Sequence, residues 1–240
     1  GPHDTDRLSL PPPPMRYEDA IDTLDVSGLR VGWSADLGFA QVDAEVAEVS
    51  RAAALDVAAA AGVELVDVDV RLTDPVATWL SAGAMSLWLS IMEHEHWPDR
   101  ADDLTPYVRT ALEATYDRPL RTLVNGYRRR LQLQQDMSDL FAEVDVLMTP
   151  TTAVPAFSAK GPPPEEIAGV AVGAAMSVPF TMLANLCWNP AVSVPAGLNS
   201  EGLPIGLQVI GRRHHDEVPL RFARLLELAR PWPRHAPAPG

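Results

Sequence analysis

The fold is decided between Asn189 and Gly211, where the sequence reads NPAVSVPAGLNSEGLPIGLQVIG. Two apolar runs, 191–194 and 205–210, have the length and the valine and isoleucine content that are typical of β-strands. The residues between them include Ser200-Glu201-Gly202, a sequence typical of turns. This stretch therefore predicts two β-strands that are separated by a turn.

Strands and helices alternate on both sides of this pair. Further strands are predicted over residues 29–33, 63–70 and 144–148. Apolar periodicity and stop signals predict helices over residues 43–61, 76–96, 105–115, 119–143, 180–187 and 216–229. This alternation predicts an α/β fold, a mixed β-sheet flanked by helices, with all five strands in one sheet.

Other segments are predicted to lack regular structure. The run from Pro11 to Pro14 excludes a helix or a central strand, so residues 1–24 are expected to form an extended, linker-like segment. Residues 153–175 are rich in proline, glycine and alanine and are predicted to form a loop. Residues 231–240 contain four prolines and are expected to form an irregular tail.

Charge and cysteine content limit the class of protein. The formal net charge is −13, so phosphate backbones and anionic lipid surfaces repel the chain, and we expect neither nucleic acid nor a membrane as a partner. The densest basic cluster, 128–130, is expected to be a solvated helix face. No apolar run reaches the roughly 18 residues of a membrane-spanning helix. A single cysteine, Cys187, fits a reducing compartment and a cytoplasmic location.

Two histidine clusters are interpreted as structural. Imidazoles two residues apart point to different sides of a helix, so His94-Glu95-His96 is expected to be a polar helix end and not a metal site. In His214-His215-Asp216, Asp216 is expected to cap the following helix through its side chain. We therefore expect no metal ion and no other cofactor.

Neither of the two reactive side-chain types forms an evident catalytic site. Cys187 lies between Leu186 and Trp188, which favours a buried structural thiol. Lys160 lies in a loop rich in proline and glycine and is expected to be exposed, although a lysine that acts as a base needs a desolvated site. The residues alone therefore predict an α/β fold without a recognisable active site.

Three segments nevertheless resemble the C-terminal part of the amidase signature family. They are residues 144–151, residues 180–186 with 189–197, and residues 202–211 closing with Asp216-Glu217. Their order and spacing also match, and residues 1–6 are similar to the segment that follows the catalytic region of the family. The resemblance covers essentially the whole chain.

The resemblance implies hydrolysis of an amide by a nucleophilic serine, a second serine in a cis peptide and a lysine. In the family these groups lie in the N-terminal half of the domain, and this sequence contains no Ser-Ser pair. We therefore expect no catalytic residue within residues 1–240. The chain is expected to be the C-terminal part of a single amidase signature domain, so its fold is incomplete. Its expected substrate is a small amide that is uncharged or aromatic. Its other expected partner is the missing N-terminal half, against which apolar surface should be exposed.

By the same resemblance, the segment from Phe180 to Asn189 faces the substrate pocket. Phe180, Thr181, Ala184 and Trp188 are the candidate lining residues, and ordinary core packing is the alternative for each. Many relatives have a Thr-Gly pair where this chain has Cys187-Trp188. A large indole at this position would narrow the pocket or offer a flat stacking surface.

Two alternative functions stay open. Glutamyl-tRNA amidotransferase A subunits have an acidic residue just before the Phe-Thr step, whereas this chain has Ser177, Val178 and Pro179. That difference disfavours a role in a transamidation complex. The second alternative is a truncated, non-catalytic chain that binds or scaffolds, and the sequence leaves a homo-oligomer open.

Overall fold

The computed structural model describes residues 2–6, 9–13, 15–93 and 97–233. Its centre is a five-stranded mixed sheet in the order β2-β1-β3-β7-β6. The strands are β1 (Val31–Trp33), β2 (Leu65–Asp67), β3 (Val146–Pro150), β6 (Ala191–Leu198) and β7 (Pro204–Gly211). β1 is parallel to both β2 and β3, while β7 is antiparallel to both β3 and β6. The prediction of one mixed sheet with these five strands is confirmed.

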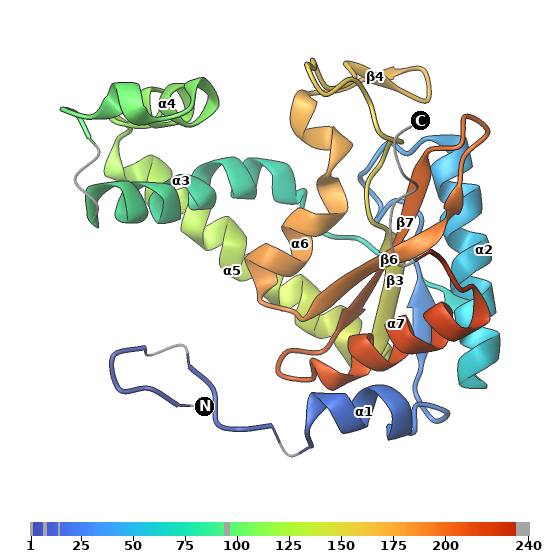
Figure 1. The fold of residues 1–240 in the computed structure, drawn as a ribbon. Coiled ribbons are helices and arrows are strands. Elements are labelled where there is room, and N and C mark those ends of the chain that lie inside the picture. Colours follow the sequence, from blue (N-terminus) through green and yellow to red (C-terminus); the bar gives the residue numbers. More distant parts are fainter. Residues whose placement is uncertain (1, 7–8, 14, 94–96, 234–240) are drawn as a thin grey trace.

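Helices cover both faces of this sheet (Figure 1). α2 (Ala44–Ala61) and α7 (Glu217–Ala229) lie on one face, and α1 (Tyr17–Thr23) packs against α7. α5 (Leu120–Glu143) and α6 (Pro179–Cys187) lie on the other face. α3 (Pro75–Glu93) packs against α5 and α6, and α4 (Pro106–Glu113) packs against α3.

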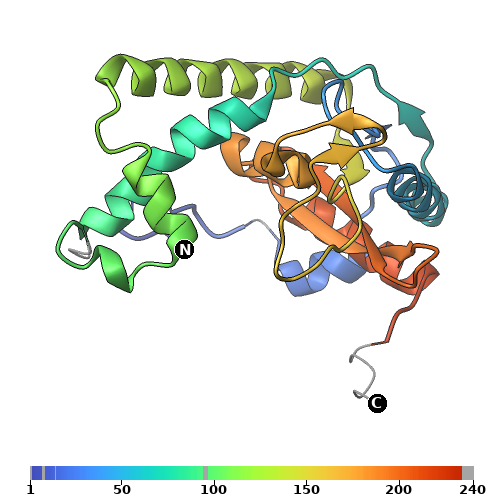
Figure 2. The ribbon, with the colours of Figure 1, turned by 90° about the horizontal axis from the view of Figure 1, so that it is seen from above.

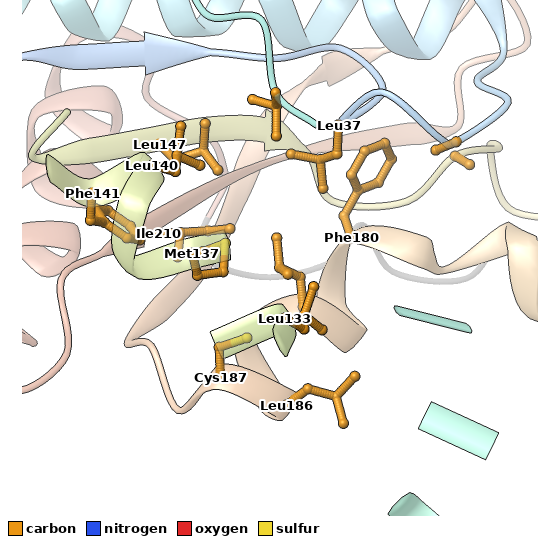
Figure 3. Close-up of a cluster of buried hydrophobic side chains, with 14 of the residues drawn as sticks. Leu37, Leu133, Met137, Leu140, Phe141, Leu147, Phe180, Leu186, Cys187 and Ile210 are labelled. Carbon is orange, nitrogen blue, oxygen red and sulfur yellow. The ribbon is translucent and has the colours of Figure 1, made fainter. Parts of the chain in front are cut away.

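The alternation of side chains along the strands divides the core into two clusters. In β3, Val146 and Met148 pack with Phe222 and Leu226 of α7 on one face. Leu147 points the other way and belongs to the second cluster. The second cluster contains Leu133 and Met137 of α5, Phe180 and Cys187 of α6, and Leu37 from the loop after β1 (Figure 3). The sheet is therefore buried on both faces, as its apolar strands require.

The first helix corrects the expected linker. Residues 17–23 form α1, so the prediction of an extended segment over residues 1–24 is wrong there. Arg221 of α7 donates hydrogen bonds to the carbonyl oxygens of Ile21 and Leu24, at 2.7 and 3.1 Å. These bonds satisfy C-terminal carbonyls that the local sequence leaves unpaired. The helix thus depends on a tertiary contact that local patterns do not reveal.

A short hairpin corrects the expected loop over residues 153–175. Glu166–Ile167 (β4) pairs antiparallel with Val170–Ala171 (β5), and Ala174–Ser177 follows as a 3-10 helix. The two turn residues, Ala168 and Gly169, have φ of 51° and 79°, as a type I′ turn requires. Alanine is rare at such a position, so the sequence carries only half of the turn signal.

The predicted helices agree with the structure to within a few residues at each end. The exception is the end of the helix expected over residues 76–96, because α3 is described to Glu93 and residues 94–96 lie outside the described part of the chain. A second 3-10 helix, Ala101–Asp103, precedes α4. In the described part of the chain, no helix is both long and apolar enough to cross a membrane.

α3, α4 and the first half of α5 project from one side of the sheet (Figures 1 and 2). Several large apolar side chains on these helices are exposed to solvent, including Leu80, Leu89, Leu120, Tyr127 and Leu131. On α5, Leu120, Val124, Tyr127 and Leu131 follow the three- and four-residue spacing of one helix face. This face carries apolar surface that no described residue covers.

A carboxylate joins three segments at one end of the sheet. Asp145, which precedes β3, forms salt bridges with Arg30 and Arg212, both at 3.0 Å. Arg30 also donates its backbone N–H to the same carboxylate at 3.0 Å. The side-chain hydrogen bonds from Arg30 are the main cause that lowers the pKa of Asp145 from 3.8 to about 2. Asp145 therefore links the starts of β1 and β3 to the end of β7.

We expect Asp145→Asn to destabilise the full-length protein by about 1–2 kcal/mol at pH 7. The pKa of Asp145 is lowered in the folded state, so its contribution is complete above the unfolded pKa of about 4 and is lost as the pH falls toward about 2. Urea unfolding of both proteins between pH 7 and pH 3 measures the difference. The difference in unfolding free energy between the two proteins should shrink below pH 4. A difference that stays constant with pH would contradict the stabilising role of the Asp145 carboxylate.

The matched control is Asp69→Asn. The Asp69 side chain is 76% exposed, and among the described residues its ion-pair partner is the exposed Arg71. Exposed pairs contribute little, so this variant is expected to change the unfolding free energy by less than about 0.5 kcal/mol.

Candidate functional site

A cavity of about 730 Å³ opens between α6, the edge strand β6 and the loop that precedes α7. The wall from α6 is made by Thr181, Ala184 and Asn185, with Trp188 directly after the helix. Ser193 and Gln208 contribute from the sheet. The loop supplies Arg213, His214 and Asp216, and the N-terminal segment supplies Ser9 and Leu10. The cavity therefore combines an apolar wall with several polar groups, as small-molecule sites commonly do.

The sheet side of the cavity is polar. Gln208 is buried, and its amide nitrogen donates to the Thr149 hydroxyl at 3.1 Å and to the Phe180 carbonyl at 3.4 Å. Ser193 and Thr151 share a hydrogen bond of 2.8 Å beside Gly206. A Cβ atom on Gly206 would lie 2.7 Å from the Thr151 hydroxyl oxygen, so the close approach requires glycine here. These bonds hold Gln208 and Ser193 in fixed positions.

The backbone at the end of α6 determines where Trp188 points. Pro179 starts the helix at a position that tolerates a missing N–H. Trp188 ends it with φ of 58° and ψ of 36°, the left-handed conformation that usually belongs to glycine. The residue is 51% exposed. The indole therefore stands at the mouth of the cavity and not in the core.

Two guanidinium groups lie over the indole. The Arg130 guanidinium is 4.8 Å from the ring centroid of Trp188, and that of Arg213 is 5.5 Å away. Both distances are within the range of a cation–π contact. Arg130 is half-buried and donates to the Leu186 carbonyl at 2.8 Å. The expectation that residues 128–130 form a solvated face is therefore wrong for Arg130, because its side chain turns back onto the end of α6.

The candidate lining residues separate into two groups. Thr181, Ala184 and Trp188 lie together on the cavity wall. Phe180 is fully buried and points into the cluster around Leu37 (Figure 3). Phe180 does not line this cavity, and its carbonyl oxygen accepts the hydrogen bond from Gln208.

The loop before α7 differs from the expected cap. Asp216 occupies the N-cap position, but its side chain makes no capping hydrogen bond. Its φ of −62° and ψ of −30° are already helical, and an N-cap side chain usually accepts from an extended backbone conformation. Asp216 lies on the cavity instead. His215 bonds to Glu217 at 3.0 Å and His214 has φ of 67°.

The other reactive side chains, Cys187 and Lys160, do not line the cavity. Cys187 is buried in the second cluster, as predicted, and burial raises the pKa of its thiol to about 12. A thiol in that state is a poor nucleophile. Lys160 is exposed, as predicted. The described residues bring together no group of three potential metal ligands. The cluster 94–96 lies outside the described residues.

The sequence patterns did not indicate Ser193, Gln208 or Arg213 as cavity residues. A signal was present for Gln208, since an amide in the middle of the apolar run 205–210 needs a buried partner. The other two follow from topology, because the sequence does not show that β6 is an edge strand or that the loop after β7 folds back over α6.

Family comparison identifies the surrounding fold. A family model described as Amidase matches residues 2–220. The chain is 30% identical over 250 residues to an acylamidase of Rhodococcus erythropolis, which covers 99% of this chain and 50% of the relative. It is 31% identical over 258 residues to the A subunit of the glutamyl-tRNA(Gln) amidotransferase of a Synechococcus strain. This match covers 94% of this chain and 50% of that relative. The chain spans about half the length of these relatives.

Solved structures share the same architecture. A bacterial aryl acylamidase of the amidase signature family superposes with a TM-score of 0.78 at 23% identity, covering 91% of this chain and 46% of that one. A 6-aminohexanoate cyclic dimer hydrolase superposes with a TM-score of 0.75 at 21% identity. The superposition covers 97% of this chain and 51% of that one. At these identities the likeness establishes the fold.

Proposed function

Because this chain belongs to the amidase family, we propose that residues 1–240 form the C-terminal part of a single amidase signature domain that hydrolyses a carboxamide C–N bond. This part completes the sheet and supplies one wall of the substrate cavity. The serine–serine–lysine group that attacks the amide belongs to the preceding half of the domain. Thr181, Ala184 and Trp188 then contact the substrate.

The observation that carries this proposal is the position of the cavity at a sheet edge along which no further strand pairs among the described residues. β6 is the last strand of the sheet, and its exposed residues Ala191 and Ser193 line the cavity. An edge strand of eight residues presents unpaired backbone groups that readily accept a further strand or a covering segment. A catalytic half that docks along β6 would close the cavity and bring its nucleophile to the substrate.

Exposed apolar residues support the same arrangement. Monomeric proteins rarely leave contiguous large apolar side chains in water without a partner. The exposed face of Leu120, Val124, Tyr127 and Leu131 on α5 is a surface of this kind. Burial against the preceding half of the domain would remove this apolar face from water and stabilise the complete domain.

Two other functions remain as alternatives. The first is a subunit of a transamidation complex, which the similarity to amidotransferase A subunits supports. Against it, Ser177, Val178 and Pro179 lack the acidic side chain expected there. The other alternative is a non-catalytic binding or scaffold chain.

The test is an assay of the full-length protein on a panel of aliphatic and aromatic carboxamides, with detection of the released amine or ammonia. Hydrolysis supports the proposal. Ammonia transfer to an acceptor only with copurified subunits supports transamidation. No turnover, in a parent without an upstream serine–serine–lysine half, supports the scaffold alternative.

We expect Trp188→Gly in the full-length enzyme to raise kcat/KM for bulky amides relative to small ones by about tenfold, since removing the indole widens the cavity mouth. The left-handed backbone suits glycine, which offsets part of the lost packing, so the unfolding free energy should change by less than about 1 kcal/mol.

The control for this variant is Leu89→Ala, a 72% exposed residue on α3 that does not line the cavity. It should leave the preference unchanged. If Trp188→Gly also leaves the preference unchanged and only destabilises the protein, Trp188 is a structural residue.

A further inference from the structure

We propose that the cavity selects amide substrates that carry a carboxylate, which Arg213 binds at the cavity mouth beside the indole of Trp188. This inference rests on the proposed amidase function and names the substrate class of the same site. The residues that carry it are Arg213, Arg130, Trp188 and Gln208.

The first observation is that the Arg213 side chain is free to bind an anion. Within the described part of the chain, Arg213 makes no ion pair and no hydrogen bond, and its guanidinium lies over the Trp188 ring at 5.5 Å. Its neighbour Arg212 is instead bound to Asp145 at 3.0 Å. A guanidinium has five N–H donors in a planar fork that matches a carboxylate. These donors stay available at the cavity.

The second observation is that the indole keeps this guanidinium in place. Trp188 lies under both Arg130 and Arg213, and Arg130 is itself fixed by its bond to the Leu186 carbonyl. Stacking on an aromatic face restricts the side chain and reduces the entropy that is lost when an anion binds.

The third observation is the local charge. The whole chain has a formal charge of −13, yet two arginines flank Trp188. The acidic group on the cavity is Asp216, which forms no salt bridge with Arg213 and lies at the N-terminus of α7, where the helix dipole stabilises a negative charge. Arg213 is therefore not neutralised, and the mouth beside Trp188 attracts an anion.

The polar groups also define an orientation. Gln208 is buried on the sheet side of the cavity, whereas Trp188 and Arg213 are exposed at its mouth. A carboxylate held by Arg213 directs the rest of the molecule inward, along the apolar wall of α6 toward Ser193 and Gln208. The reacting amide then lies at the β6 edge, and the carboxylate lies at the opposite end of the substrate.

The test compares two acetanilides of similar shape in the full-length enzyme, 4-acetamidobenzoate and the neutral 4-nitroacetanilide. Intrinsic reactivity cancels when the ratio of their kcat/KM values is compared between variants. Arg213→Gln is expected to lower the carboxylate-to-neutral ratio by about 10- to 100-fold, mainly through KM, which corresponds to the loss of charge-assisted hydrogen bonds. Arg213→Lys keeps the positive charge but loses the planar guanidinium. Its carboxylate-to-neutral ratio should lie between the ratios of the wild type and of Arg213→Gln.

The matched control is Arg129→Gln, an exposed arginine on α5 without an ion pair among the described residues. It should leave the ratio unchanged. An unchanged ratio in Arg213→Gln, or an equal fall in Arg129→Gln, would overturn the proposal.

Failure of the amidase function itself is recognised separately, because then the wild-type protein hydrolyses neither compound. The anion site is in that case judged by calorimetry with benzoate and benzamide. Tighter binding of benzoate that is lost in Arg213→Gln supports the site, and equal binding of the two compounds refutes it.

Discussion

Purified residues 1–240 are expected to hydrolyse amides no faster than buffer, and the proposed amidase activity is expected only of the full-length protein. Enzymes accelerate such reactions by about 10⁶-fold or more, through a nucleophile, proton transfer and stabilisation of the oxyanion. This chain has no Ser-Ser pair, its single thiol is buried with a pKa of about 12, and Lys160 is exposed. A cavity wall alone supplies none of these effects.

The measurement uses both proteins at equal concentration on the same panel of amides. Circular dichroism first establishes that residues 1–240 are folded. Adding the separately expressed N-terminal half should restore activity if the two halves associate. Turnover by residues 1–240 alone, abolished by Cys187→Ser or His214→Ala, would move the chemistry into this half and contradict the assignment.

Phe180→Ala is expected to destabilise the full-length protein by about 3–5 kcal/mol. Phe180 is fully buried in the second core cluster, and the truncation leaves a cavity between α6 and the loop after β1. Since domains are stable by about 5–15 kcal/mol, this loss removes a large part of the total. Guanidinium unfolding measures it.

Leu228→Ala is the matched control, because Leu228 is apolar but 60% exposed on α7. The unfolding free energy of the Leu228→Ala variant should differ from that of the wild type by less than about 0.5 kcal/mol. If Phe180→Ala instead keeps its stability and changes the substrate preference, Phe180 belongs to the substrate cavity, as the sequence resemblance implied.

The central sheet could be predicted because its strands carry their own signals. The runs 191–194 and 205–210 are apolar and separated by a turn, and 144–148 ends in a Thr-Pro step. Alternation with helical segments then predicts one sheet between helices. α1 could not be predicted in this way, because the partner that satisfies its last carbonyls, Arg221, lies about 200 residues further along the chain.

The candidate site was less accessible to prediction. The resemblance to the family implied that the segment from residue 180 onward faces the substrate pocket. Only the structure distinguishes the buried Phe180 from Trp188 at the cavity mouth. Both residues are large and apolar in the sequence, and the difference arises from the left-handed backbone at the end of α6. Arg213 gave no signal, since an arginine in a loop is usually a solvated charge.

The order of the strands has a consequence for how the chain folds. β6 and β7 are joined by a short turn in which the Asn199 side chain accepts from the backbone N–H groups of Glu201 and Leu203. β1 and β3 are neighbours too, but their linking contact, between Arg30 and Asp145, joins residues 115 positions apart. Closing a long loop is slow compared with forming a hairpin. We therefore expect the C-terminal hairpin to form early and the pairing of β1 with β3 to limit the folding rate.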